Sequence, residues 1–197
     1  MSTKKIASER YNEILDVTIS IMAFEGEASA TMRSISKRLG IRLSTLQYYF
    51  PNKRELLKSA IEKCIASMDR KKAAIAKRGK LEPNAQLIKL VRVHLAASRD
   101  PLVAGFFTGL WGLAVHDNDA KELLNELYER DLDHFRENIA RANSRLSSQT
   151  CHSRAVLLLS QIEGLTLFVS PGKSSAPMYN ELEKELIRIV ETAILTS

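Results

Sequence analysis

Residues 31–53 read TMRSISKRLGIRLSTLQYYFPNK, and this stretch predicts two short helices joined by a tight turn. Thr31 can cap the first helix, because its hydroxyl accepts a hydrogen bond from a free backbone N–H. Gly40 is placed to end that helix, since glycine adopts the left-handed conformation of a C-cap at little cost. The second helix is expected from about Arg42 until Pro51 interrupts the pattern. The stretch therefore predicts a helix–turn–helix.

The second of these helices is predicted to present a polar face without acidic residues. Its outward side chains are short or planar groups that form hydrogen bonds, and such a helix suits entry into the major groove of DNA. Leu43 is ambiguous, because it could pack on a thymine methyl or simply be exposed. The face therefore predicts contact with DNA bases. The outward residues are Arg42, Ser44, Thr45, Gln47 and Tyr48, with Tyr49 at the edge.

The basic charge of the chain is concentrated in its N-terminal part. Residues 1–80 contain 17 Lys and Arg against 8 Asp and Glu, whereas residues 81–197 contain 12 against 15. A basic surface attracts phosphates and gains affinity from the counterions that they release. The charge distribution therefore supports the same function as the helix–turn–helix.

Composition indicates a globular protein without a membrane segment. The chain has 197 residues, of which 45% are hydrophobic and 26% charged, as is ordinary for a soluble domain. Its apolar runs are too short and too often interrupted to span a bilayer, and no signal peptide is evident at the N-terminus. Cys64 and Cys151 are interpreted as buried thiols in a reducing compartment. We expect a cytoplasmic protein.

The whole chain is predicted to be all-α, with about nine helices and no strand. Apolar residues recur at helical spacing, and no run alternates apolar and polar residues for long enough to indicate a sheet. Asn52 with Glu55, and Asp119 with Glu122, have the spacing of capping boxes. The expected helices are about 9–24, 31–39, 42–49, 52–77, 84–98, 102–115, 119–145, 153–170 and 178–195.

The N-terminal residues resemble the signature of TetR-family transcriptional regulators. The resemblance extends from about Glu9 to Leu57 and combines apolar, glycine and aromatic positions at matching spacing. It departs at Ser36, where alanine is common, and at Gln47, where tyrosine is common. Gln47 lies at a position expected to touch DNA, so the operator sequence does not follow from the resemblance. The matching residues are Ile14, Leu15, Phe24, Gly26, Thr31, Ile35, Leu39, Gly40, Ile41, Leu46, Tyr49, Phe50, Lys53 and Leu56.

The resemblance implies two functional domains. Residues 1–57 are expected to form the helix–turn–helix domain, and its fourth helix continues to about residue 78 as a connector. Residues 79–197 are expected to form a helical domain that binds an effector and dimerises. Arg42 could pair with guanine or with a phosphate, and Gln47 could pair with adenine. The implied DNA contacts are Thr31, Arg33, Arg42, Ser44, Thr45, Gln47, Tyr48, Tyr49 and Lys53.

The helix expected at 102–115 contains Gly105, Gly109 and Gly112, and each glycine costs about 1 kcal/mol relative to alanine. Either close helix packing or space for a ligand would offset that cost. An aromatic cavity with a few polar groups is a typical small-molecule site, and the resemblance favours such a pocket over simple core packing. The candidate lining residues are His94, Phe106, Phe107, Leu110, Trp111, Tyr128, Gln161 and Phe168.

The last two predicted helices carry more apolar surface than a thin helical layer buries by itself. In the resembled family these helices pair with their counterparts in a four-helix bundle, which implies a homodimer. A twofold dimer would place two base-reading helices about one DNA turn apart and would suit a palindromic operator. The candidate interface residues are Leu159, Ile162, Leu182, Leu186 and Ile189.

The sequence carries no recognisable catalytic motif. It contains no glycine-rich phosphate loop and no Gly-x-Ser-x-Gly motif, and its four histidines lack the spacing of a zinc site. We expect no enzyme activity, no metal and no cofactor. The leading hypothesis is a repressor that a small-molecule effector, whose identity the sequence does not reveal, releases from double-stranded DNA. The alternative is a protein-interaction module, or an effector-independent regulator, of the same fold.

Overall fold

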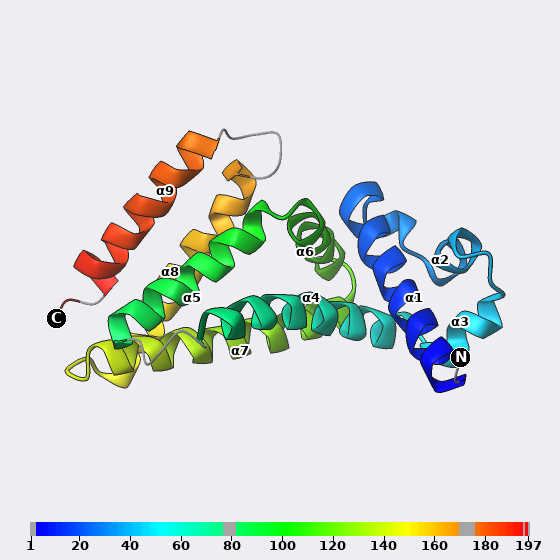
Figure 1. Cartoon of the computed structure of the whole chain (residues 1–197), viewed down its shortest axis with the longest axis horizontal. Coiled ribbons are helices and arrows are strands. Elements are labelled where there is room, and N and C mark those ends of the chain that lie inside the picture. Colours follow the sequence, from blue (N-terminus) through cyan, green and yellow to red (C-terminus); the bar gives the residue numbers. More distant parts are fainter. Residues whose placement is uncertain (1–2, 77–81, 170–175, 195, 197) are drawn as a thin grey trace. The chain divides into compact units, whose positions relative to one another are not determined.

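The computed structural model describes residues 3–76, 82–169, 176–194 and 196, and this part of the chain is helical without a strand (Figure 1). The prediction of an all-α protein is confirmed. Gly79, in the expected linker, lies outside the described residues. The elements are α1 (Thr3–Glu25), the short 3-10 turn η1 (Glu27–Ser29), α2 (Met32–Arg38), α3 (Leu43–Tyr49), α4 (Lys53–Ala76), α5 (Pro83–Arg99), α6 (Pro101–Ala114), α7 (Asn118–Ala142), α8 (Ser148–Val169), α9 (Ala176–Ile189) and the π-helical η2 (Val190–Ile194).

The start of α7 differs from the prediction. The Asp117 carboxylate accepts the Ala120 backbone N–H at 3.0 Å and so caps the helix, a role that the sequence pattern assigns to Asp119. Asp119 and Glu122 instead pair with Arg54 of α4, at 2.7 and 2.9 Å. Their spacing therefore reflects a contact between helices and not a capping box.

The start of α8 also differs, because this helix begins at Ser148, five residues before the expected 153. The Ser147 hydroxyl accepts the Thr150 backbone N–H at 3.0 Å, which is the bond of an N-cap. The prediction placed the start at the apolar run, whereas the polar first turn of the helix precedes that run.

The chain divides into two compact units. The first contains Met1–Ser67 and Leu102–Asn125, and the second contains Met68–Pro101 and Glu126–Ser197. Most of α6 therefore belongs to the same unit as the helix–turn–helix. The expected boundary at residue 79 instead places this helix with the C-terminal helices. The first unit buries residues from α1, α2, α3 and α6, including Ile14, Ile35, Leu46, Phe106 and Leu110.

Close packing of α6 on the end of α1 explains two of the three glycines. A Cβ atom added to Gly105 would lie 2.6 Å from the backbone oxygen of Ala23, and one added to Gly109 would lie 3.1 Å from that of Met22. Both distances are too short for an ordinary contact, so these glycines permit the two helices to approach. The explanation that they provide space for a ligand is wrong for Gly105 and Gly109. A Cβ at Gly112 would meet only the Glu27 carboxyl group, at 4.0 Å.

The core of the second unit is built from α5, α7, α8 and α9. Leu159 and Leu186 are each only 4% exposed and Ile162 is 1% exposed, because all three pack inside this core. The expectation that they form a dimer interface is therefore wrong for Leu159 and Ile162, which are almost fully buried within one chain, whereas Leu186 also lines a groove between α8 and α9 and its part in an interface stays a prediction. Helix α8 is apolar on two sides, so the sequence alone did not distinguish its inward face from its outward one. Leu182 and Ile189 are partly buried at the edge of the core.

Candidate nucleic-acid interface

Local hydrogen bonds determine the geometry of the helix–turn–helix. The Ser34 backbone N–H donates to Thr31 Oγ1 at 3.1 Å, and the Thr31 N–H donates to Ser34 Oγ at 2.9 Å. This reciprocal capping box confirms Thr31 as the N-cap of α2. Its other member is a serine, where glutamate or glutamine is more usual.

The turn between α2 and α3 is formed at Gly40, whose φ of 64° is in the left-handed region. The Gly40 N–H donates to the Lys37 carbonyl at 3.1 Å, and the Ile41 N–H donates to the Ser36 carbonyl at 3.0 Å. These two bonds are the Schellman pattern that satisfies the last carbonyls of a helix. The turn therefore depends on a residue without a Cβ atom, as the sequence predicts.

Helix α3 is held against the first unit by its inner face. Leu46 is fully buried, and Phe50 directly after the helix is 1% exposed. The Phe50 ring packs against the ring of Tyr11 in α1, with 4.7 Å between the ring centroids. Because these anchors face the core, the opposite face of α3 is directed to solvent.

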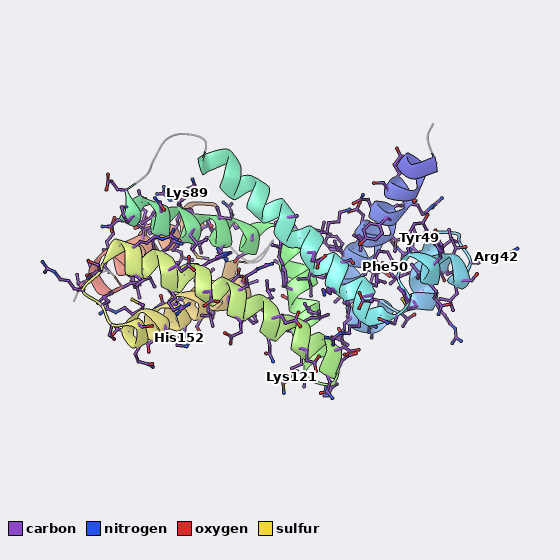
Figure 2. All side chains as sticks on the ribbon, turned by 90° about the horizontal axis from the view of Figure 1, so that it is seen from below. Arg42, Tyr49, Phe50, Lys89, Lys121 and His152 are labelled. Carbon is purple, nitrogen blue, oxygen red and sulfur yellow. The ribbon has the colours of Figure 1, made fainter. Side chains whose placement is uncertain are left out.

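The outward face carries the residues that the sequence assigns to DNA. Tyr48 is the most prominent, with 81% of its surface exposed, and its ring lies edge-on to that of Tyr49. Figure 2 shows Arg42 at the outer edge of this segment. Thr31, Arg33, Arg42, Ser44, Thr45, Gln47 and Tyr48 are exposed, and Tyr49 and Lys53 are partly exposed.

Ion pairs leave most of the cations near this face available. Arg38 pairs with Glu25 at 2.8 Å, and this is the one ion pair that a cation of residues 31–42 makes within the described part of the chain. Arg33, Lys37 and Arg42 therefore present positive charge beside the polar face of α3. Such an arrangement suits phosphate contact at the rim and base contact at the centre.

The predicted pocket residues are divided between the two units. Phe106, Phe107, Leu110 and Trp111 belong to the first unit, where Phe106 and Leu110 are fully buried in packing. His94, Tyr128, Gln161 and Phe168 belong to the second unit. There, Gln161 and Phe168 line a groove between α8 and α9, together with Ser160, Gly164, Leu165, Leu182, Glu185, Leu186 and Ile189. Phe168 is 66% exposed, so it lines a surface groove and not an enclosed cavity.

A polar group in the second unit was only partly predicted. His94 of α5 lies with its Nε2 atom 3.7 Å from Asp131 Oδ2 of α7. The pKa of Glu163 in α8 is raised to about 7, chiefly because the side chain is buried. The charge of His94 acts to lower this pKa, and the charge of Asp131 acts to raise it. No pattern in the sequence indicates the two acids, because their proximity to His94 depends on how three helices pack.

Among the described residues, no group of three or more His, Cys, Asp or Glu side chains could hold a metal ion. No helix of the described ranges is both long and apolar enough to cross a membrane.

Comparison with known proteins agrees with this geometry. Residues 14–60 match the family model of bacterial regulatory proteins, tetR family. The chain is 34% identical over 100 residues to the HTH-type transcriptional repressor KstR of Rhodococcus jostii (strain RHA1). These aligned residues are 51% of this chain and 46% of that protein. The chain is also 30% identical over 100 residues to KstR of Mycobacterium tuberculosis (strain ATCC 25618 / H37Rv), again covering 51% and 46%. The chain thus matches about half the length of these curated relatives.

Solved structures extend the similarity to the whole fold. A Rhodococcus sp. protein assigned to the TetR family has a TM-score of 0.77 at 16% identity, covering 93% of this chain and all of the other. A regulator from Saccharomonospora viridis, solved in complex with choline, has a TM-score of 0.74 at 20% identity and covers 94% and 97%. Fold and site together define a helix–turn–helix protein with a helical C-terminal part. Residues 14–60 carry the helix–turn–helix signature of the TetR family of bacterial regulatory proteins, and the chain as a whole shares the fold of regulators assigned to that family.

Proposed function

We propose that the chain is a DNA-binding transcriptional repressor that a small-molecule effector releases from a palindromic operator. The observation that carries this proposal is the outward face of α3, which is exposed, polar and free of acidic residues. A protein surface that contacts phosphates and base edges needs hydrogen-bonding groups without competing negative charge. The match to KstR repressors supports the direction of regulation.

Individual roles follow from chemistry and position. Gln47 and Tyr48 lie on the exposed face of α3 and are proposed to contact bases, since an amide can form two hydrogen bonds with adenine. Arg42 is proposed to contact either guanine or a phosphate. Thr31, Arg33, Tyr49 and Lys53 flank this face and are proposed to contact the DNA backbone.

A homodimer is proposed from the groove between α8 and α9. Leu165, Phe168, Leu182 and Ile189 give this groove an apolar lining. Leu157 and Leu167 of α8 are also more than half exposed. An apolar surface of this kind is costly to leave in water and suits a second copy of the same helices. The predicted interface residues Leu182 and Ile189 remain part of this proposal, and Phe168 joins them.

Phe168→Asp tests the dimer, because it places a charge in the proposed interface. Light scattering should show a dimer for the parent chain and a folded monomer for the variant. His152→Asp is the matched control, since His152 is exposed near the other end of α8. A dimer that survives Phe168→Asp would place the interface elsewhere.

Regulation by a small molecule is the less direct part of the proposal. The Saccharomonospora viridis structure contains choline, which supports the idea that a chain of this fold can hold a small organic molecule. Binding of an effector would shift the population toward a form whose two α3 helices no longer match the operator spacing. The proposal assigns no catalytic activity to the chain.

Selection of genomic DNA tests the central claim. The protein is incubated with fragments of its own genome, and the bound fragments are sequenced and then titrated at several salt concentrations. A palindromic site bound with a steep salt dependence is expected, because several phosphate contacts release counterions. Absence of any enriched fragment would favour the alternative, a protein-interaction module of the same fold.

A further inference from the structure

Arg54 of α4 and two acids of α7 form an ion-pair group inside the first unit, here named the Arg54 clamp. Arg54 Nη1 lies 2.7 Å from Asp119 Oδ1 and 2.9 Å from Glu122 Oε2. The three residues are far apart in the sequence, but all belong to the first compact unit. The clamp therefore joins the helix that follows the helix–turn–helix to the start of α7.

The two acids of the clamp project from the same side of α7. Residues three apart are neighbours on a helix surface, so both carboxylates converge on one guanidinium nitrogen. Only 29% of the Arg54 side chain is exposed, whereas those of Asp119 and Glu122 are 58% and 63% exposed. A single exposed ion pair contributes little, but a partly buried arginine held by two acids is restricted in its position.

The α7 side of the clamp is firmly supported. The Asp117 carboxylate caps this helix by accepting the backbone N–H of Ala120, whose side chain is fully buried. The next turn is anchored by Leu123 and Leu124, which are 4% and 6% exposed. Because packing and the cap fix this part of α7, its two acids hold the arginine from a defined position.

The α4 side of the clamp is the first turn of a helix, where backbone hydrogen bonds are few. The first N–H groups of a helix have no partner inside it, so side chains decide how firmly the first turn is held. Asn52 supplies one restraint, since its Oδ1 atom accepts the Glu55 N–H at 2.9 Å. Arg54 supplies another and links this turn to a different helix.

Lys53 is the first residue of α4 and directly precedes Arg54. It is partly exposed and is the proposed contact to a DNA phosphate. Successive residues of a helix are turned by about 100° about its axis, so holding Arg54 against α7 also fixes the direction in which Lys53 leaves the helix. A contact made from a fixed turn costs less to order than one made from a fraying turn.

We propose that the Arg54 clamp positions Lys53 for DNA binding, by holding the first turn of α4 so that the lysine faces a phosphate. Arg54 is a positioning residue that acts through Lys53 and does not itself touch DNA. This inference rests on the proposed DNA binding and names residues outside α3 that determine its strength. Asp119 and Glu122 then favour the binding of a polyanion, although both are negatively charged.

Asp119→Asn combined with Glu122→Gln in the full chain tests the proposal, because two explanations predict opposite signs. Loss of the clamp should weaken binding to the genome-selected operator by about three- to tenfold, as expected for a small network of partly exposed charges. Electrostatics alone predicts tighter binding, because the variant has two fewer negative charges. Glu126→Gln combined with Glu129→Gln is the matched control, since both are exposed acids of α7, and it should not weaken binding. Fluorescence anisotropy at constant salt measures both pairs.

Removal of Lys53 gives a second measurement that a general loss of folding would not reproduce. The Asp119 and Glu122 substitutions are repeated in a chain that carries Lys53→Ala. If the clamp acts through Lys53, they should have no further effect there, whereas independent effects would multiply. Melting curves establish that every variant is folded at the temperature of the binding assay.

Two outcomes would overturn the inference. Operator affinity equal to or higher than that of the control pair would show that the two acids position nothing, and a higher affinity would indicate that the released Arg54 contacts phosphate itself. Equal fold-losses with and without Lys53 would show that the clamp does not act through this lysine. Failure of the parent chain to bind any genomic fragment would instead reject the proposed function.

Discussion

The outward faces of α3 and α8 differ in kind. On α3, one buried leucine holds the helix to the core, and the exposed residues are polar. On α8, buried Leu158 and Ile162 alternate with exposed Leu157 and Phe168, so both faces are apolar. A polar exposed face suits a hydrated partner such as DNA, whereas an apolar exposed face calls for another protein surface. Exposure alone therefore does not identify a partner, and the chemistry of the exposed face must be considered as well.

The largest expected effect separates the two faces of α8. Leu159→Ala should lower the free energy of unfolding by about 2–5 kcal/mol, because it leaves a cavity in the core of the second unit. In the Phe168→Asp background, where the proposed dimer contact is lost, Leu157→Ala removes the same atoms from a side chain that is 59% exposed, and should cost less than about 1 kcal/mol. Urea unfolding at fixed protein concentration measures both. Equal losses would show that the inward face has been assigned incorrectly.

A second test compares two glycines of α6, one packed closely against the backbone of α1 and one with open space around it. Gly105→Ala should lower the free energy of unfolding by about 1–3 kcal/mol, because its Cβ would collide with the backbone of Ala23. Gly112→Ala should be neutral or stabilise by up to about 1 kcal/mol, since alanine is the better helix former. Thermal melting compares the two. A melting temperature that Gly105→Ala leaves unchanged would contradict the packing explanation.

Base contact by α3 is the next effect in size. Gln47→Ala and Tyr48→Ala should each weaken binding to the selected operator by about 1–3 kcal/mol, with little change on unrelated DNA. Gln149→Ala is the matched control, because Gln149 is an exposed glutamine of α8. Fluorescence anisotropy at constant salt measures all three. Parent-like operator affinity in both α3 variants would remove α3 from the interface.

The smallest effect is expected at Lys53, which flanks the polar face of α3. Lys53 is proposed to contact phosphate, so Lys53→Ala should weaken specific and non-specific binding alike. The slope of log affinity against log salt should fall by about one unit, since one fewer counterion is released. Titrations on operator and unrelated DNA at several salt concentrations measure the slope. A loss confined to the operator would instead indicate base contact.

Sequence patterns predict correctly those parts of the structure that depend only on neighbouring residues. Thr31, Gly40 and Pro51 act within a few residues of themselves, through a cap, a left-handed turn and a break in helix propensity. The all-α class, the helix–turn–helix and its exposed polar face follow from such local rules, and the structure has them as predicted.

Tertiary structure alone decided which apolar face is buried and which distant groups meet. An apolar pattern on two sides of α8 leaves the inward direction open, and only packing against α5, α7 and α9 places Leu159, Ile162 and Leu186 in the core. Likewise Gly105 is explained by Ala23 of a different helix, and His94 meets Asp131 across two helices. The physical reason is the same in each case: contact energies between helices depend on relative position, which helical periodicity does not encode.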